Sequence, residues 1–290
     1  MISFSLVDLI AICAILAFGI SAFLFSRSGN DLAPSNPKAL LAARGEAGNG
    51  QPRKRLAVCA GDSITRGAVS VDYVTALATR LPDWEFSNAG VNAELAYNLA
   101  ERVGDIVALK PDAVTILIGT NDVLATFGFR NALGYMAAKR LPERPSTLFY
   151  RENLTAIVRT LKRETGARIA LFSLPPIGED PGHYAYIRTE DYSRIVRDIS
   201  RTEGVAYLPL RERLCAYLET MPPFDRERQL RFKAFGRAQL RAGRMQRYLG
   251  KSLDEISAAN RFHILVDGVH LNSHGAAIAA ELAGEFLRGY

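Results

Sequence analysis

From residue 56 onward, short apolar segments alternate with longer amphipathic segments, and no other feature constrains the fold of this chain as much. The apolar segments are largely uncharged and partly β-branched, as the buried strands of a parallel sheet are. Because a crossover helix must join consecutive parallel strands, the pattern predicts a three-layer α/β/α sandwich. The predicted strands are residues 56–60, 84–88, 113–118, 168–174 and 205–208.

Helices are predicted between these strands, and a last helix closes the domain. Their predicted ranges are 71–81, 94–109, 150–165, 189–202 and 274–288. In the third, the i, i+3, i+4, i+7 spacing of a core-facing stripe is filled by Leu154, Ile157, Val158 and Leu161. Two inserts interrupt the alternation, at residues 124–147 and 222–262. The sequence therefore predicts one α/β domain over residues 55–290 that carries two inserts.

The eighteen residues from Leu9 to Ser26 carry no charge. As a helix they would be about 27 Å long, which is close to the apolar thickness of a bilayer. No Lys or Arg precedes them and no small-x-small cleavage site follows, so residues 1–26 are predicted to be an uncleaved single-pass transmembrane anchor rather than a cleaved signal peptide. Residues 27–54 are rich in Gly, Ala, Asn and Pro and are predicted to be a flexible linker.

The net charge of +6 is concentrated in two places. One includes Arg53, Lys54 and Arg55 after the apolar segment, and the positive-inside rule would keep the following domain in the cytoplasm. The other, from Arg226 to Lys251, holds nine Lys or Arg residues and a single acid. It fits a solvated helical face or, because apolar residues are interleaved, a basic amphipathic segment on an anionic membrane surface. Nucleic acid is not expected as a partner, since no nucleic-acid motif accompanies the charge.

Glycine and polar residues follow the first predicted strand at Gly61, Asp62 and Ser63. Open α/β sheets bind their ligands at the carboxyl ends of the strands, so Ser63 is a candidate nucleophile. The alternative is a capped turn, in which Asp62 or Ser63 only caps the next helix. A serine nucleophile also needs a base and a group that orients the base.

The chain has four histidines that could supply the base. His270 follows Asp267 by three residues on one predicted loop, which lets Asp267 bind one ring nitrogen while the other faces the serine. His183 is expected on a loop near the rim, His263 beside the core, and His274 in the first turn of the last helix. His270 is therefore the predicted base.

Two further loops offer donors for the oxyanion of a tetrahedral intermediate. Gly90 follows the second predicted strand and could offer an unobstructed backbone N–H, and Asn121 follows the third and could offer its side-chain amide. The alternative for each is an ordinary turn, in which Gly and Asn are common. The loops after the first three strands emerge on the same edge of a parallel sheet, which favours the catalytic interpretation.

These segments resemble the SGNH (GDSL-type) hydrolase family, whose name records a serine, a glycine, an asparagine and a histidine. The matching segments, in the family's order, are Gly61-Asp62-Ser63-Ile64-Thr65, Gly90, Gly119-Thr120-Asn121-Asp122 and Asp267-Gly268-Val269-His270. The resemblance spans residues 56–287. It implies a flavodoxin-like sheet of five parallel strands in the order 2-1-3-4-5.

The resemblance also implies the residues of the site. They are a triad of Ser63, Asp267 and His270 and an oxyanion hole of Ser63 N–H, Gly90 N–H and the Asn121 amide. Asp62 and Asp122 are expected to brace their loops rather than to act on substrate. No cofactor and no metal are implied.

The predicted function is a serine ester hydrolase that acts through an acyl-enzyme on small acyl esters, lysophospholipids or acylated saccharides. An O-acyltransferase that uses the same triad is an alternative, since a sugar hydroxyl can replace water. A membrane-tethered binding protein with a vestigial site belongs to a different class, and the intact set of site residues argues against it. Many members of the family act outside the cytoplasm, so the side of the membrane stays open.

Overall fold

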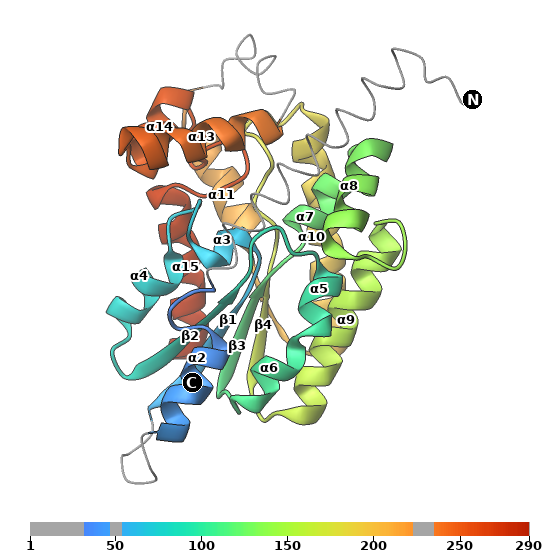
Figure 1. Cartoon of the computed structure of the whole chain (residues 1–290), viewed down its shortest axis with the longest axis vertical. Helices are drawn as coiled ribbons and strands as arrows, with labels where there is room; N and C mark the ends of the chain where they lie inside the picture. Colours follow the sequence, from blue (N-terminus) through green and yellow to red (C-terminus); the bar gives the residue numbers. More distant parts are fainter. Residues whose placement is uncertain (1–31, 47–53, 223–234, 290) are drawn as a thin grey trace, which may run out of the picture.

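The described part of the computed structural model, residues 32–46, 54–222 and 235–289, contains a five-stranded parallel sheet between two layers of helices (Figure 1). The strand order β2-β1-β3-β4-β5 confirms the predicted three-layer sandwich and its topology. The strands are β1 (Arg55–Gly61), β2 (Trp84–Gly90), β3 (Ala113–Leu117), β4 (Arg168–Phe172) and β5 (Ala206–Leu208). Each strand overlaps a predicted one, and the uncharged runs in β1 and β3 are buried on both faces.

The helices divide between the two faces according to the direction of each crossover. The connection from β1 to β2 runs opposite to the later ones, and right-handed crossovers then put its helix on the other face. That face carries α4 (Tyr73–Arg80), α11 (Leu210–Glu219) and α15 (Ser273–Arg288). The opposite face carries α5 (Ala96–Glu101), α6 (Val103–Ala108), α9 (Thr147–Glu164) and α10 (Tyr184–Glu203).

Helix α9 shows how the sequence pattern becomes packing. The predicted stripe of Leu154, Ile157, Val158 and Leu161 is fully buried in the main core. Each such side chain stabilises the fold by about 1.5–3 kcal/mol relative to an exposed one.

The segment predicted to be a flexible linker is partly ordered on the domain. Helix α2 (Pro37–Glu46) begins with a proline after Asn36, whose side chain accepts hydrogen bonds from Lys38 N–H and Ala39 N–H. Arg44 then forms an ion pair with Glu85 of β2. The linker prediction is therefore wrong for residues 32–46, because a cap and long-range contacts stabilise a helix that lacks strong periodicity.

The helix predicted over 94–109 is divided at Arg102, which separates α5 from α6. Its side chain pairs with Glu94 and donates to the carbonyl of Ala89 at the end of β2 (2.8 Å). At this division, a half-buried arginine thus reaches the carboxyl edge of the sheet.

Both predicted inserts lie at the carboxyl edge of the sheet and contain helices (Figure 1). The first insert contains α8 (Phe129–Lys139), which follows α7 (Thr120–Ala125). The second contains α13 (Phe235–Leu249) and α14 (Leu253–Asn260). The predicted transmembrane anchor lies outside the described residues, and no helix within them combines the length and apolar character needed to cross a membrane.

Candidate active site

Ser63 is the first residue of α3 (Ser63–Arg66), immediately after β1. Asp62 caps this short helix, because its Oδ1 accepts the Ile64 N–H (3.0 Å). The side chain of Ser63 is almost completely buried, so the cap and its neighbours hold it in place. Capping and a reactive position are therefore compatible at this turn, and the two interpretations of the sequence do not exclude each other.

The last loop of the chain brings a histidine and a carboxylate to this serine. Ser63 Oγ lies 2.9 Å from His270 Nε2, across 207 positions of sequence. His270 Nδ1 lies 2.8 Å from Asp267 Oδ2. A proton on Nδ1 satisfies the carboxylate and leaves Nε2 free to accept the serine proton. The three side chains predicted to act together are thus linked by hydrogen bonds, from Ser63 to His270 and from His270 to Asp267.

Asp267 is itself held by the backbone of its own loop. Its Oδ1 accepts hydrogen bonds from Val269 N–H and His270 N–H, both at 3.0 Å. Burial alone would raise the pKa of Asp267, but His270 and these two N–H groups outweigh it and lower the pKa. Burial alone would lower the pKa of His270, but the Asp267 charge outweighs it and raises the pKa. The pair therefore stabilises an imidazolium.

Two residues that the sequence analysis did not single out hold this loop in position. Glu179, in the loop after β4, accepts the N–H groups of His263, Ile264 and Leu265 at 2.8–3.0 Å. On the other side, Ser70 Oγ donates to the Leu271 carbonyl (3.2 Å) and accepts the Leu271 N–H (3.1 Å). Neither residue belongs to a local pattern, so only their long-range contacts reveal them.

The remaining histidines have structural contacts instead. His183 caps α10 and accepts the Ala185 N–H (3.3 Å). His274 stacks on Tyr217 with ring centroids 3.8 Å apart. His263 takes part through its backbone in the contact with Glu179.

Asn121 lies in α7, beside the nucleophile turn, and all three of its polar positions are engaged. Its Nδ2 donates to the Glu94 carbonyl (3.0 Å) and, over a longer distance, to Asp62 Oδ2 (3.3 Å). Its Oδ1 accepts a hydrogen bond from Tyr135 Oη of α8 (2.9 Å). Tyr135 therefore fixes which end of the amide faces Asp62, and sequence reasoning did not anticipate this contribution from the first insert.

Asp62, the N-cap of α3, and Asp122, in the first turn of α7, are buried carboxyls. Asp122 Oδ2 accepts the Ala96 N–H (3.1 Å), whereas its Oδ1 has no hydrogen-bond partner in the described part of the chain. Burial raises the pKa of each to about 7, and the charge of Asp62 adds to the effect on Asp122. Their contacts are with backbone N–H groups and Asn121, which is what bracing of the loops requires.

The expectation that Gly90 has an unobstructed N–H is wrong. This N–H donates to Asn88 Oδ1 (3.0 Å) at the end of the same strand, β2. A Cβ on Gly90 would lie 2.2 Å from Arg66 N, so the glycine is needed because α3 packs directly on the end of β2. Three residues later, Ala93 adopts a φ of +58°, which is unusual for alanine and shows that the surroundings dictate the course of this loop.

With the geometry established, comparison with known proteins identifies the family. The model of the GDSL-like lipase/acylhydrolase family matches residues 59–278, about three-quarters of the chain. The chain belongs to this family. A search of the curated proteins finds no match to this GDSL-like protein.

Solved structures of low sequence identity share the fold. An acetyl xylan esterase, AlAXEase, has 19% identity and a TM-score of 0.55, with 80% of this chain and 99% of that chain covered. An acetylxylan esterase from Geobacillus stearothermophilus has 22% identity and a TM-score of 0.56, with 83% and 94% covered. A hydrolase from the metagenome of Lake Arreo, Spain, has 18% identity and a TM-score of 0.56, with 80% and 94% covered. The GDSL-like chain is therefore a hydrolase that acts on ester bonds, built on the fold of these proteins.

Proposed function

We propose that this GDSL-like hydrolase cleaves esters through an acyl-enzyme on Ser63, with His270 as the base and Asp267 as the group that orients it. The observation that supports the proposal most is the pair of hydrogen bonds from Ser63 to His270 and from His270 to Asp267, 2.9 and 2.8 Å long. A serine paired in this way is the arrangement that activates a hydroxyl nucleophile.

In the first half-reaction, His270 Nε2 takes the proton of Ser63 Oγ as the oxygen bonds to the acyl carbon. The tetrahedral intermediate collapses with cleavage of the carbon–oxygen bond to the alcohol, and the imidazolium returns its proton to the leaving oxygen. In the second half-reaction, His270 removes a proton from water, which attacks the acyl carbon and releases Ser63. Asp267 stays ionised throughout and stabilises the imidazolium.

The oxyanion in this proposal is bound by Ser63 N–H and the Asn121 amide. Asn121 Nδ2 donates its shorter hydrogen bond to the Glu94 carbonyl (3.0 Å) and its longer one to Asp62 Oδ2 (3.3 Å). The contact with Asp62 is the one that an oxyanion would replace. Because Gly90 N–H already donates to Asn88, its predicted contribution would require that bond to open.

The proposed substrates are small acyl esters, lysophospholipids or acylated saccharides. The structural neighbours named as acetylxylan esterases support an acetylated sugar as the first compound to test. Their identity to this chain is too low to transfer their specificity, so acyl chains of graded length belong in the same screen.

Hydrolysis of p-nitrophenyl acetate by the purified full chain and by Ser63→Ala tests the proposal. We expect Ser63→Ala to lose essentially all turnover, because loss of the serine of such a triad costs about 10⁶-fold in kcat. Ser273→Ala, at the exposed start of α15, is the matched control and should keep full activity. Equal rates for Ser63→Ala and the parent would refute the nucleophile. Transfer of the acyl group to an added sugar in preference to water would make the protein an O-acyltransferase.

We also propose that the chain is held at a membrane by the apolar residues from Leu9 to Ser26, a proposal that rests on the sequence alone. Replacement of Ile15 by Arg should release the protein from a carbonate-washed membrane fraction, since an arginine at the centre of a span costs about 3 kcal/mol or more. Unchanged retention would contradict the anchor.

A further inference from the structure

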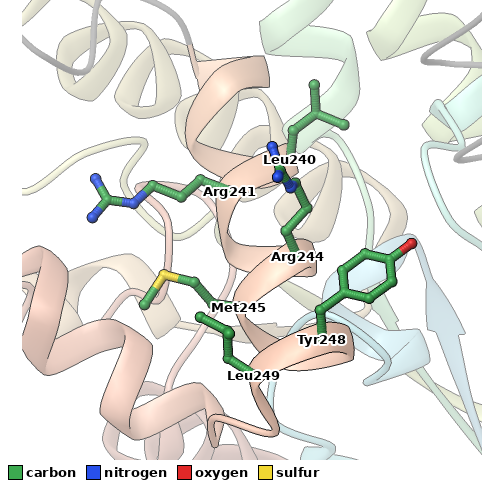
Figure 2. A pocket seen from close by; sticks show the side chains of 6 residues that line it. All are labelled: Leu240, Arg241, Arg244, Met245, Tyr248 and Leu249. Carbon is green, nitrogen blue, oxygen red and sulfur yellow. The ribbon is translucent and has the colours of Figure 1, made fainter.

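Helix α13, in the second insert, exposes large apolar side chains and arginines on the same surface. Leu240, Tyr248 and Leu249 are 46%, 75% and 67% exposed, whereas the apolar side chains of the core are buried. Arg244 is also exposed, and together with Arg241 and Met245 these residues line an open hollow along the helix (Figure 2). We call the exposed side chains of Leu240, Arg241, Arg244, Arg247, Tyr248 and Leu249 the α13 surface.

The opposite side of α13 packs beside the candidate active site. Ala242 is buried against Ile256 of α14 and Val266, the residue before Asp267. Gln246 Nε2 donates to the Ala68 carbonyl (3.4 Å), in the turn that follows α3. The helix is therefore fixed to both loops that supply the proposed triad, and Figure 1 shows it at the same end of the molecule as α3.

The arginines of the α13 surface have no acidic partner among the described residues. Within residues 32–46, 54–222 and 235–289, no carboxylate forms an ion pair with Arg241, Arg244 or Arg247. Several exposed arginines on the helices that cover the sheet do pair with acids, as Arg151 does with Asp198 and Arg194 with Glu190. The α13 surface thus combines uncompensated positive charge with exposed apolar area.

Other exposed apolar side chains lie at the same edge of the sheet. They belong to α8 and to the first turns of α9 and α10, which begin after the carboxyl ends of β3 and β4. These residues are Phe129, Leu133, Leu148, Tyr184 and Ile187. The α13 surface is therefore not the only exposed apolar area at this edge of the described structure.

We infer that the α13 surface docks on an anionic phospholipid bilayer. A helix that lies on such a bilayer buries an apolar side in the headgroup region and places arginines at the lipid phosphates. Tyr248 has the apolar body and polar tip suited to that depth. Because α13 contacts the segments next to Ser63 and Asp267, docking would bring the end of the molecule that carries the candidate site to the membrane. The inference concerns binding and does not depend on the proposed esterase activity.

A fluorescent reporter on α13 tests the docking in the full chain. The protein contains one tryptophan, Trp84, which is buried, so Tyr248→Trp adds a single exposed indole. We propose to reconstitute this variant in nanodiscs of brominated phosphatidylcholine, with and without phosphatidylserine. The matched control is Arg80→Trp, an exposed position at the end of α4 and thus at the opposite edge of the sheet.

Docking predicts that phosphatidylserine will shift the emission of the reporter at position 248 to the blue and bring about its quenching by bromine. The reporter at position 80 should show neither change. Replacing Arg241, Arg244 and Arg247 by Gln should abolish most of the quenching, and about 1 M salt should weaken it because the Debye length falls to about 3 Å.

Three outcomes would overturn the inference. The first is equal quenching with and without phosphatidylserine, and the second is quenching that survives the triple Gln substitution. The third is a response to single-stranded RNA but not to anionic lipid, which would make the surface a nucleic-acid site. The triple variant should hydrolyse p-nitrophenyl acetate at the parental rate, and Ser63→Ala should still dock, so failure of one proposal is distinguishable from failure of the other.

Discussion

The candidate active site and helix α13 lie at the same end of the molecule, but their side chains are held in opposite ways. At the site, Ser63, Asp267 and His270 are almost inaccessible to solvent, and each is hydrogen-bonded: Ser63 to His270 from another loop, and Asp267 to His270 within its own loop. On α13, Arg244 and Tyr248 extend into solvent with no partner in the described part of the chain. Buried polar groups must be paired to be tolerated, whereas exposed charge and apolar area remain available for a partner.

After the loss of Ser63 itself, removing the charge of the triad carboxylate should produce the largest change. Asp267→Asn leaves His270 without the charge that stabilises its imidazolium and sets its tautomer, so we expect kcat to fall by up to about 10⁴-fold. Because Asp267 raises the pKa of His270, the acid limb of kcat/KM for the parent should lie above pH 6.5, and the variant's limb should move to lower pH. Arg244→Gln on α13 is the control, and its rate on a soluble ester should match the parent's. An unchanged rate in Asp267→Asn would mean that another group orients His270.

Loss of the Asn121 amide should have the next largest effect. Asn121→Ala removes one proposed oxyanion donor, for which a fall of about 10²–10³-fold in kcat is typical. The KM should change little, because the donor acts mainly on the transition state. Asn131→Ala, whose amide makes only a long contact with the Leu124 carbonyl (3.4 Å), is the matched control. Similar kinetics for the two variants would remove Asn121 from the oxyanion site.

Asp122 is a buried carboxyl whose Oδ1 has no hydrogen-bond partner in the described part of the chain. Its ionisation should therefore change the stability of the fold. Its folded-state pKa of about 7 is above the ordinary value of 3.8, so the native state keeps a proton that the unfolded chain loses. Its contribution to stability is therefore present below about pH 4 and is lost as the pH rises toward 7. Asp122→Asn should not lose this contribution. Between pH 5 and pH 8, its free energy of unfolding should therefore rise by roughly 2–3 kcal/mol relative to that of the parent. Urea unfolding of both proteins at pH 5 and at pH 8 measures this difference in the free energy of unfolding.

The control for this experiment is Asp83→Asn, at an exposed position before β2, which should leave the pH dependence as it is in the parent. A gain for Asp122→Asn that is the same at pH 5 and pH 8 would show that the buried carboxyl does not titrate between these values.

The smallest expected effect belongs to Tyr135, which acts through Asn121. Tyr135→Phe removes the hydrogen bond that orients the amide, and we expect kcat to fall about tenfold, as the loss of about 1.4 kcal/mol would cause. The same substitution in an Asn121→Ala background should have no further effect, because the partner is already absent. Tyr97→Phe, whose ring stacks on Phe149, is the control. Additive losses in the double variant would show that Tyr135 only supports packing.

Local patterns were sufficient to predict most of the fold. Most of the strands were predictable because they are short, largely apolar runs, and the buried stripe of α9 because its spacing matches the helical period. The division at Arg102 and the docking of α2 were not predictable, since both depend on side chains that reach across the chain to Glu94 and to Glu85. Periodicity describes which side of an element is buried and carries no information about such distant partners.

The residues of the candidate site also fall into those that a local motif predicts and those that it does not. Ser63, Asp267 and His270 could be named from short motifs, and the structure brings them within hydrogen-bond distance of one another. Glu179 and Tyr135 could not be named, because their partners are remote in sequence. Gly90 was assigned an open N–H because a motif records which residue is present and not what it already binds.

Glu179 has a consequence for how the molecule matures. Its carboxylate binds backbone that lies 84–86 residues further along the chain, and that backbone leads directly to Asp267. The catalytic histidine of the proposal can therefore reach its position only after the loop following β4 and the C-terminal segment have both folded. Recovery of activity on refolding therefore requires this long-range contact in addition to the sheet.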